Sequence, residues 1–125
     1  MSGRNRARSR PRWLRYCGVR RWGRDIVLYE DTWYDKVLAS HIEMSDMIDA
    51  VVQTLTDPDR VAFDASFAGG ENYYRRWVLP HPYDVDFLKV VVRFEDINGE
   101  MAGVVVTAFS APNSKKRGER FKWNR

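Results

Sequence analysis

The sequence has a single cysteine, Cys17, only two histidines and no long apolar run. One cysteine excludes an internal disulfide framework and a cysteine-based metal cluster, and it favours a reducing cytoplasm. A membrane-spanning helix needs roughly 20 predominantly apolar residues, and a secretory signal needs an apolar core. Neither pattern is present, so we expect no association with a membrane.

The chain also lacks a glycine-rich phosphate loop, a paired His/Cys metal-binding spacing and a serine-nucleophile motif. Four acidic residues lie near one another but match no metal-binding loop: Asp25, Glu30, Asp31 and Asp35. The sequence therefore gives no support for a reaction that depends on a bound metal ion or cofactor. We expect neither a metal ion nor a cofactor.

Positive charge is concentrated at the start of the chain. Residues 1–24 contain nine Arg and no acid, which leaves twelve basic and seventeen acidic residues, so the net +4 is +9 there and −5 elsewhere. We expect residues 1–24 to form a basic tail, disordered or peripheral, and residues 25–125 to form a single domain. The tail could bind nucleic-acid phosphates. A solubilising extension, or upstream sequence included by start-codon choice, explains it at least as well.

The segment after this tail has the pattern of two helices. Thr32 is a plausible N-cap for a helix from Trp33 to about Ser40, and Ser45 is a cap candidate for the next. Pro58 stops the second helix. The second helix would direct these side chains inward: Met47, Ile48, Val51, Val52 and Leu55.

From Val61 onward the pattern changes to short extended runs, "VAFD", "NYYRRWVL" and the two halves of residues 88–110. The last two are separated by Asn98-Gly99, a pair typical of hairpin turns. Helices followed by strands predict an α+β domain, with two N-terminal helices packed on a four-stranded antiparallel sheet. The other face of that sheet would be open.

Alternation assigns the side chains of residues 88–110 to two faces. One face would carry Leu88, Val90, Val92 and Phe94 from the first strand, with Val104, Val106 and Ala108 from the second. The other would carry Lys89, Val91, Arg93 and Glu95, with Val105, Thr107 and Phe109. The cations and the hydroxyl of this second face could bind a phosphodiester and stabilise its transition state, or could simply be a solvated surface.

Further candidates lie at a helix end, in one strand and at the C-terminus. His41 could be a general acid or base, or only a helix-end surface residue. In "YYRR", residues 73–76, an Arg and a Tyr on one face could bind phosphate and stack on a base, unless they pack as an ordinary amphipathic strand. The basic, aromatic segment "SKKRGERFKWNR" suits nucleic acid, and a charged tail equally.

Several short motifs follow one another in a familiar order: "WYDKVLASHIEM", "VVQTLTDPDRV" with Asp64 after it, "YYRR", "LKVVVRF" and "VVVTAF". Over roughly Ile26 to Trp123, this series resembles the phage-type family of nucleases with the barnase, EndoU, colicin and RelE-like (BECR) fold. The resemblance implies the same fold as the pattern above, and an activity similar to toxin and phage-associated ribonucleases.

The resemblance also implies the site. The catalytic set would be His41, Tyr74, Arg75, Arg76, Lys89, Arg93 and Thr107. The substrate-binding set would be Lys115, Lys116, Arg117 and Trp123. Relatives often have a proline directly after the histidine, where this chain has Ile42, so we expect the ring of His41 to be held less tightly.

The leading hypothesis is a metal-independent endoribonuclease in which the ribose 2′-hydroxyl attacks the adjacent phosphorus, with His41 as base or acid and Thr107 orienting a phosphate oxygen. Its partners would be RNA and, for a toxin, a cognate immunity protein. It would act in the cytoplasm, or be delivered into a target-cell cytoplasm as part of a larger protein. The alternative is a non-catalytic RNA- or protein-binding domain of the same fold, which the −5 charge of the body slightly favours. Catalysis requires His41 to lie near Lys89, Arg93 and Thr107.

Overall fold

A computed structural model of the protein describes residues 15–82, 86–112 and 117–125. The first helix consists of η1 (Thr32–Val37) and α2 (Leu38–Ser40), and the short turn η2 (Ile42–Met44) follows it. The second helix is α3 (Ile48–Thr56). Both predicted helices are therefore confirmed. The predicted N-caps Thr32 and Ser45 are wrong, because Asp31 and Met47 occupy these positions. No helix in the described part of the chain is long and apolar enough to cross a membrane.

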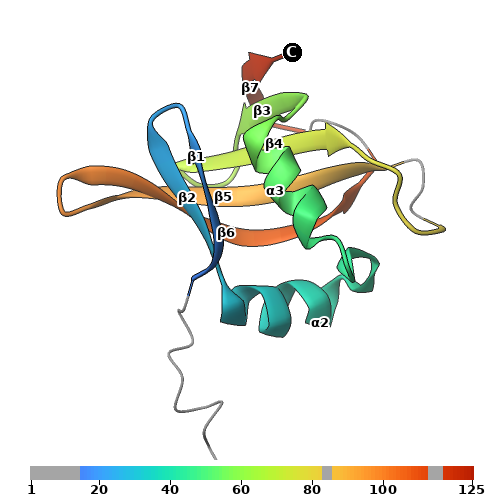
Figure 1. The fold of residues 1–125 in the computed structure, drawn as a ribbon. Helices are drawn as coiled ribbons and strands as arrows, with labels where there is room; N and C mark the ends of the chain where they lie inside the picture. Colours follow the sequence, from blue (N-terminus) through green and yellow to red (C-terminus); the bar gives the residue numbers. More distant parts are fainter. Residues whose placement is uncertain (1–14, 83–85, 113–116) are drawn as a thin grey trace, which may run out of the picture.

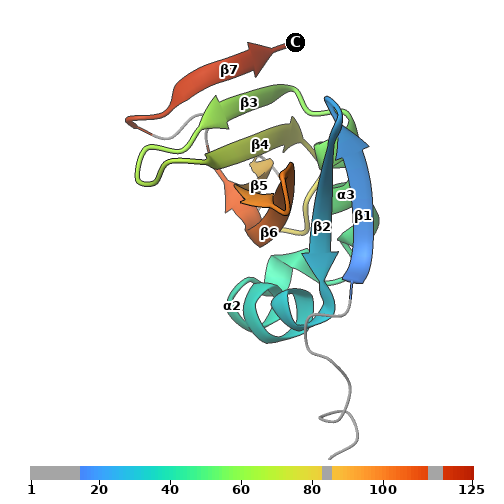
Figure 2. The ribbon, with the colours of Figure 1, turned by 90° about the vertical axis from the view of Figure 1, so that its left-hand side faces the viewer.

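The strands form one seven-stranded sheet in the order β1-β2-β6-β5-β4-β3-β7 (Figure 1). They are β1 (Arg15–Arg21), β2 (Arg24–Tyr29), β3 (Arg60–Phe63), β4 (Gly70–Arg76), β5 (Phe87–Ile97), β6 (Glu100–Ala111) and β7 (Arg120–Asn124). β2 pairs in parallel with β6, and every other pairing is antiparallel. Figure 2 shows that the sheet curls strongly, as half of a barrel would.

The predicted four-stranded antiparallel sheet is wrong, although the α+β class is confirmed. The extra strands are β1, β2 and β7. β1 lies in the Arg-rich segment that was expected to be a tail. It forms a hairpin with β2, which was not predicted because the segment is so rich in arginine. β7 lies in the basic C-terminal segment and pairs with β3. Strand pairing uses backbone groups, and charged side chains are common on strands at the edge of a sheet, so the charge of these segments is compatible with pairing.

The main core lies between the helices and one face of the sheet, here called the inner face. Trp33 and Val37 from the first helix, and Val51 and Leu55 from α3, are buried there. The sheet contributes these side chains: Ile26, Leu28, Val61, Tyr73, Leu88, Val90, Val92, Phe94, Val105 and Ala108. Alternation along β5 is therefore confirmed.

The β5–β6 hairpin turns at Asn98 (φ 54°) and Gly99 (φ 86°), the positive-φ pair that a type I′ turn requires, so the predicted hairpin is confirmed. Alternation along β6 is interrupted. Val91 pairs with Thr107 but Val92 pairs with Val105, so Val106 is an extra, bulged residue. Because of this bulge, Val105 lies in the core with Ala108, and the prediction that it shares a face with Thr107 is wrong.

The opposite, outer face of the sheet is not a bare solvent surface. A second buried cluster lies on it, formed by Ala62, Tyr74 and Ala111 with Phe87 and Phe109 packed against them. Register places Tyr74 beside Lys89, and Lys89 beside Phe109. Lys89, one of the polar residues singled out in the sequence, therefore lies between two aromatic side chains.

Candidate functional site

His41 lies at the edge of the outer face. It follows α2 directly. Its backbone N–H donates the last helical hydrogen bond, to the Val37 carbonyl at 2.7 Å, and its φ of −135° and ψ of 80° end the helix. Its ring stacks on Phe109 with centroids 5.1 Å apart and an interplanar angle of 26°. Phe109 stands beside Lys89 in the register of β5 and β6. The histidine therefore reaches the row of side chains to which the sequence assigned a phosphate-binding role.

A buried carboxylate stands beside the histidine. Glu43 Oε2 lies 4.0 Å from His41 Nδ1, and it accepts hydrogen bonds from the Ser110 backbone N–H at 3.0 Å and from Ser110 Oγ at 3.1 Å. The Glu43 side chain is 5% exposed, whereas that of His41 is 32% exposed. A fixed carboxylate therefore lies on the Nδ1 side of the ring.

Lys89 is enclosed on the outer face. Its ammonium lies 5.2 Å from the Tyr74 ring centroid and 5.6 Å from that of Phe109, and its side chain is 7% exposed. Glu119 Oε2 accepts a hydrogen bond from Lys89 Nζ at 3.2 Å, and Glu119 Oε1 accepts one from the Tyr74 hydroxyl at 2.7 Å. The positive charge of Lys89 is thus matched by a buried negative one.

Asn72 continues this polar cluster toward the loop after β3. Its Nδ2 donates to Glu119 and, at 3.1 Å, to Asp64 Oδ1. Burial acts to raise the pKa of Asp64, but hydrogen bonds from Asn72 and from the backbone of Ser66 and Phe67 outweigh it and keep that pKa below its usual value. Asn72 Oδ1 is buried and has no hydrogen-bond partner among the described residues.

Three further predicted residues also lie on the outer face. Thr107 is half-buried and precedes Phe109 by two residues on the same face of β6. Arg93 is four residues along β5 from Lys89, about 13 Å away at the usual rise of a strand, and pairs with Glu95 at 3.4 Å. Arg76 is exposed, with its guanidinium 5.6 Å from the Phe87 ring centroid. Exposed cations therefore flank the enclosed Lys89.

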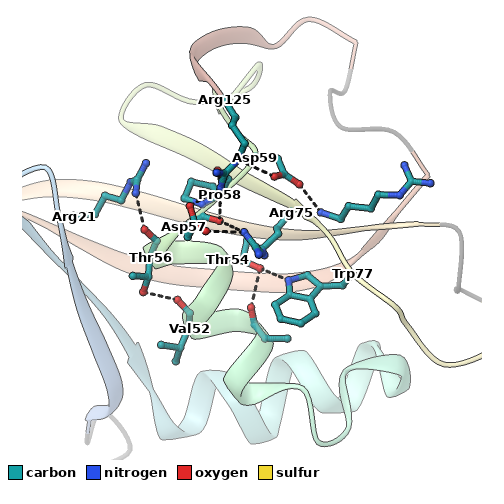
Figure 3. Close-up of polar contacts among 12 residues, drawn as sticks. Arg21, Val52, Thr54, Thr56, Asp57, Pro58, Asp59, Arg75, Trp77 and Arg125 are labelled. Atoms are coloured by element: carbon teal, nitrogen blue, oxygen red, sulfur yellow. Dashed lines mark hydrogen bonds and ion pairs between the residues drawn. The ribbon is translucent and has the colours of Figure 1, made fainter.

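Arg75 lies on the inner face instead. Its Nη1 donates to Asp57 Oδ2 at 3.1 Å, and its guanidinium lies 5.5 Å from the Trp77 ring centroid. Figure 3 shows it bound to the residues that end α3, beside the hydrogen bond from Trp77 to Thr54. Arg75 therefore fixes β4 to the helix rather than facing His41.

The predicted substrate-binding set is divided. Trp123 packs against the main core and contacts Trp22 edge to face, with centroids 6.4 Å apart. Arg117 is exposed, two residues before Glu119. Lys115 and Lys116 lie outside the described residues, as does the part of the predicted tail that precedes β1.

Four features of this site were not predicted from the sequence: Glu43, Asn72, Glu119 and the Phe109 ring on which His41 stacks. Only two of them carried a local signal. Glu43 is two residues from His41, and Glu119 is the single acid in the otherwise basic segment "SKKRGERFKWNR". The partners of Glu119 are 30 to 47 residues away in sequence, so only the fold brings them together.

Chemically, this arrangement combines a partly exposed imidazole, a hydroxyl, a phenol and flanking cations on one face. It can exchange protons and bind an anion. Among the described residues, no three His, Cys, Asp or Glu side chains are grouped so that they could hold a metal ion. Comparison of the chain with protein-family models, with curated proteins and with solved structures finds no match.

Proposed function

We propose that the protein is a metal-independent endoribonuclease that cleaves RNA by attack of the ribose 2′-hydroxyl on the adjacent phosphorus. One observation carries the proposal. The stack of His41 on Phe109 brings an imidazole to the face that carries Lys89 and Thr107. These residues come from a helix end and from two strands. A surface that only bound RNA would not need the imidazole there.

In this proposal His41 exchanges protons through Nε2, because Glu43 faces the other ring nitrogen. Thr107 orients a phosphate oxygen, and Tyr74 is fixed by its hydrogen bond to Glu119. RNA supplies its own nucleophile, so the protein needs only to position the phosphodiester and to stabilise the charge that develops on it.

The cations of this face have different roles in the proposed reaction. The Lys89 ammonium is enclosed and paired with Glu119, so it acts through short-range hydrogen bonds and contributes little net field. The exposed Arg76 and Arg117 supply most of the attraction for phosphate, and Arg93 adds less because Glu95 pairs with it at 3.4 Å. Such a local positive patch would attract RNA even though the net charge of residues 25–125 is −5.

The pairing of Lys89 with Glu119 also favours a second candidate, a non-catalytic RNA-binding domain. An ammonium that is already neutralised and buried stabilises a fold without needing a substrate. Binding by the exposed arginines would then be the whole function, and His41 would serve only to pack against Phe109.

Analysis of the cleavage products separates the two candidates. Mixed-sequence RNA is incubated with the protein in excess EDTA, and the new ends are identified by mass spectrometry. We expect 2′,3′-cyclic phosphate and 5′-hydroxyl ends, because the 2′-oxygen is the nucleophile. RNA of the same sequence with 2′-O-methyl groups should remain intact. Ends with 3′-hydroxyl and 5′-phosphate would contradict the proposal, and binding without cleavage would favour the second candidate.

A further inference from the structure

A row of alternating cations and aromatic rings runs from the β1–β2 turn to β7. Lys122 Nζ lies 5.1 Å from the Trp22 ring centroid and 5.7 Å from that of Phe63. The Arg120 guanidinium lies 5.2 Å from the Phe63 centroid, and that of Arg21 lies 4.5 Å from the Trp22 centroid. The side chains of this row, here called the cation-aromatic row, are Arg21, Trp22, Lys122, Phe63 and Arg120.

Trp22 has an unusual backbone position for its size. It occupies the first central position of a tight turn, with φ 52°, followed by Gly23 with φ 75°. The equivalent positions of the β5–β6 turn are Asn98 and Gly99, the residues that such turns favour. A bulky aromatic residue at positive φ is an outlier, and backbone outliers of this kind gather at functional sites. The turn geometry does not require Trp22, and its edge-to-face contact with Trp123 still leaves the indole partly exposed.

The row is also accessible and positively charged. Trp22 is 44% exposed although two cations lie over its ring, and Arg120 is exposed. Glu71 pairs with both Lys122, at 2.7 Å, and Arg24, at 2.9 Å, so two cations share one carboxylate there. With Arg21 and Arg120 added, these groups carry a local excess of positive charge.

We propose that the cation-aromatic row is a binding surface for single-stranded RNA, with bases stacked against Trp22 and phosphates held by Lys122 and Arg120. Interleaved aromatic and basic side chains are the means by which proteins bind single strands without reading sequence. An acidic peptide would use the cations but would gain nothing from an exposed indole. The inference rests on the proposed function for its choice of RNA.

The row lies at the end of the molecule opposite α2, the helix that His41 follows, although Arg120 comes directly after Glu119, the partner of Lys89. The β1–β2 turn and β7 are at the top of the molecule in Figures 1 and 2, whereas α2, which His41 follows, is at the bottom. In register, Phe63 and Arg120 pair next to Ala62 and Phe121, so they face away from the cluster around Tyr74. This surface would therefore hold the RNA strand at a distance from the bond that is cut.

The test compares Trp22→Asn and Arg120→Gln with two matched controls on η1, Tyr34→Asn and Lys36→Gln. Each change is made in the full chain carrying His41→Ala, so that the RNA remains intact. Affinity for a labelled single-stranded RNA of about 12 nucleotides is measured by fluorescence anisotropy between about 50 and 200 mM salt. Thermal unfolding is measured in parallel.

We expect Trp22→Asn to weaken binding by about 5- to 150-fold, with an unchanged or higher Tm because asparagine tolerates positive φ. Arg120→Gln should reduce the slope of log affinity against log salt by about 0.7. Neither control should change binding. Equal affinity of the Trp22→Asn and Tyr34→Asn variants for the RNA would overturn the inference. A fall in Tm that accompanies lost binding would also overturn it. So would competition for the labelled RNA by polyglutamate that is as strong as competition by unlabelled RNA.

The outcome is distinguishable from failure of the proposed function, because cleavage is measured separately in the chain that keeps His41. If RNA binds through Trp22 but is never cut, this inference holds and the nuclease proposal fails. If RNA is cut and the Trp22→Asn variant binds it normally, the nuclease proposal holds and this inference fails.

Discussion

Glu119 connects the buried polar groups of the outer face. Its carboxylate accepts hydrogen bonds from Lys89, Tyr74 and Asn72, and the residue is 2% exposed. A buried ion pair contributes little net stability compared with an apolar pair, but removing one partner leaves an uncompensated charge. At the residue scale, Glu119 is therefore the position where a change of one atom should matter most.

We expect Glu119→Gln to lower the free energy of unfolding by about 3–5 kcal/mol, because it leaves the Lys89 ammonium buried without its counter-charge. Adding Lys89→Met should restore much of this loss. Urea unfolding measures both effects. The exposed pair of Arg93 and Glu95 provides the control, since Glu95→Gln should cost less than about 1 kcal/mol. A similar small cost for Glu119→Gln would show that the Lys89 charge is not dependent on this carboxylate.

The structural elements show what the sequence could predict and what it could not. Pro58 and the Asn98-Gly99 pair act locally, so the end of α3 and the β5–β6 hairpin were predicted correctly. The bulge at Val106 depends on how β6 pairs with β5, and no residue in the local sequence indicates it. β1 and β7 were missed because their charges resemble those of solvated tails, whereas their stability comes from neighbouring strands.

β7 is held to the end of α3 by the last residue. The Arg125 backbone N–H donates to the Asp59 carbonyl at 2.9 Å, its Nε donates to Asp59 Oδ1 at 3.2 Å, and its Nη2 pairs with Asp57 (Figure 3). The hydrogen bond from Arg125 holds the pKa of Asp57 below its usual value. The contacts of Arg125 therefore connect the edge strand β7 to the C-terminal end of α3, a helix whose side chains pack in the main core.

We expect Arg125→Ala to change the overall free energy of unfolding little, because these ion pairs are exposed, but to loosen β7 selectively. Hydrogen exchange should show faster exchange of the amides that pair β7 with β3, with little change in the pairing of β5 with β6. Arg93→Ala, which removes another exposed ion pair, should leave β7 exchange unchanged. Uniform acceleration across the sheet would contradict a local role for Arg125.

At the scale of the whole molecule, Glu71 links the two ends of the curled sheet. It accepts hydrogen bonds from Arg24 on β2, from Lys122 on β7 and from the Tyr73 hydroxyl on β4. Burial acts to raise its pKa, but the two cations outweigh burial and keep the pKa of Glu71 below its usual value. Its ionised form therefore stabilises the folded state.

This linkage predicts an acid-sensitive fold. A carboxyl whose pKa is lowered by folding contributes its full stabilisation above its unfolded pKa, about 4.3, and loses it as the pH falls through the lower folded pKa. We expect Glu71→Gln to lower stability at neutral pH and to flatten the decline of Tm below about pH 4.3. Glu100→Gln, at an exposed position of β6, should leave the decline unchanged. An identical decline in Glu71→Gln would contradict the role of Glu71.

The most direct test of the nuclease proposal is the single-turnover rate of RNA cleavage in excess EDTA, compared between the unmodified chain, His41→Ala and the surface control Lys36→Ala. General acid–base catalysis contributes about 10²- to 10⁴-fold, so His41→Ala should lose that factor while Lys36→Ala keeps the full rate. Circular dichroism confirms that each variant is folded. Equal cleavage by a folded His41→Ala variant would contradict the proposal that His41 is the catalytic base or acid.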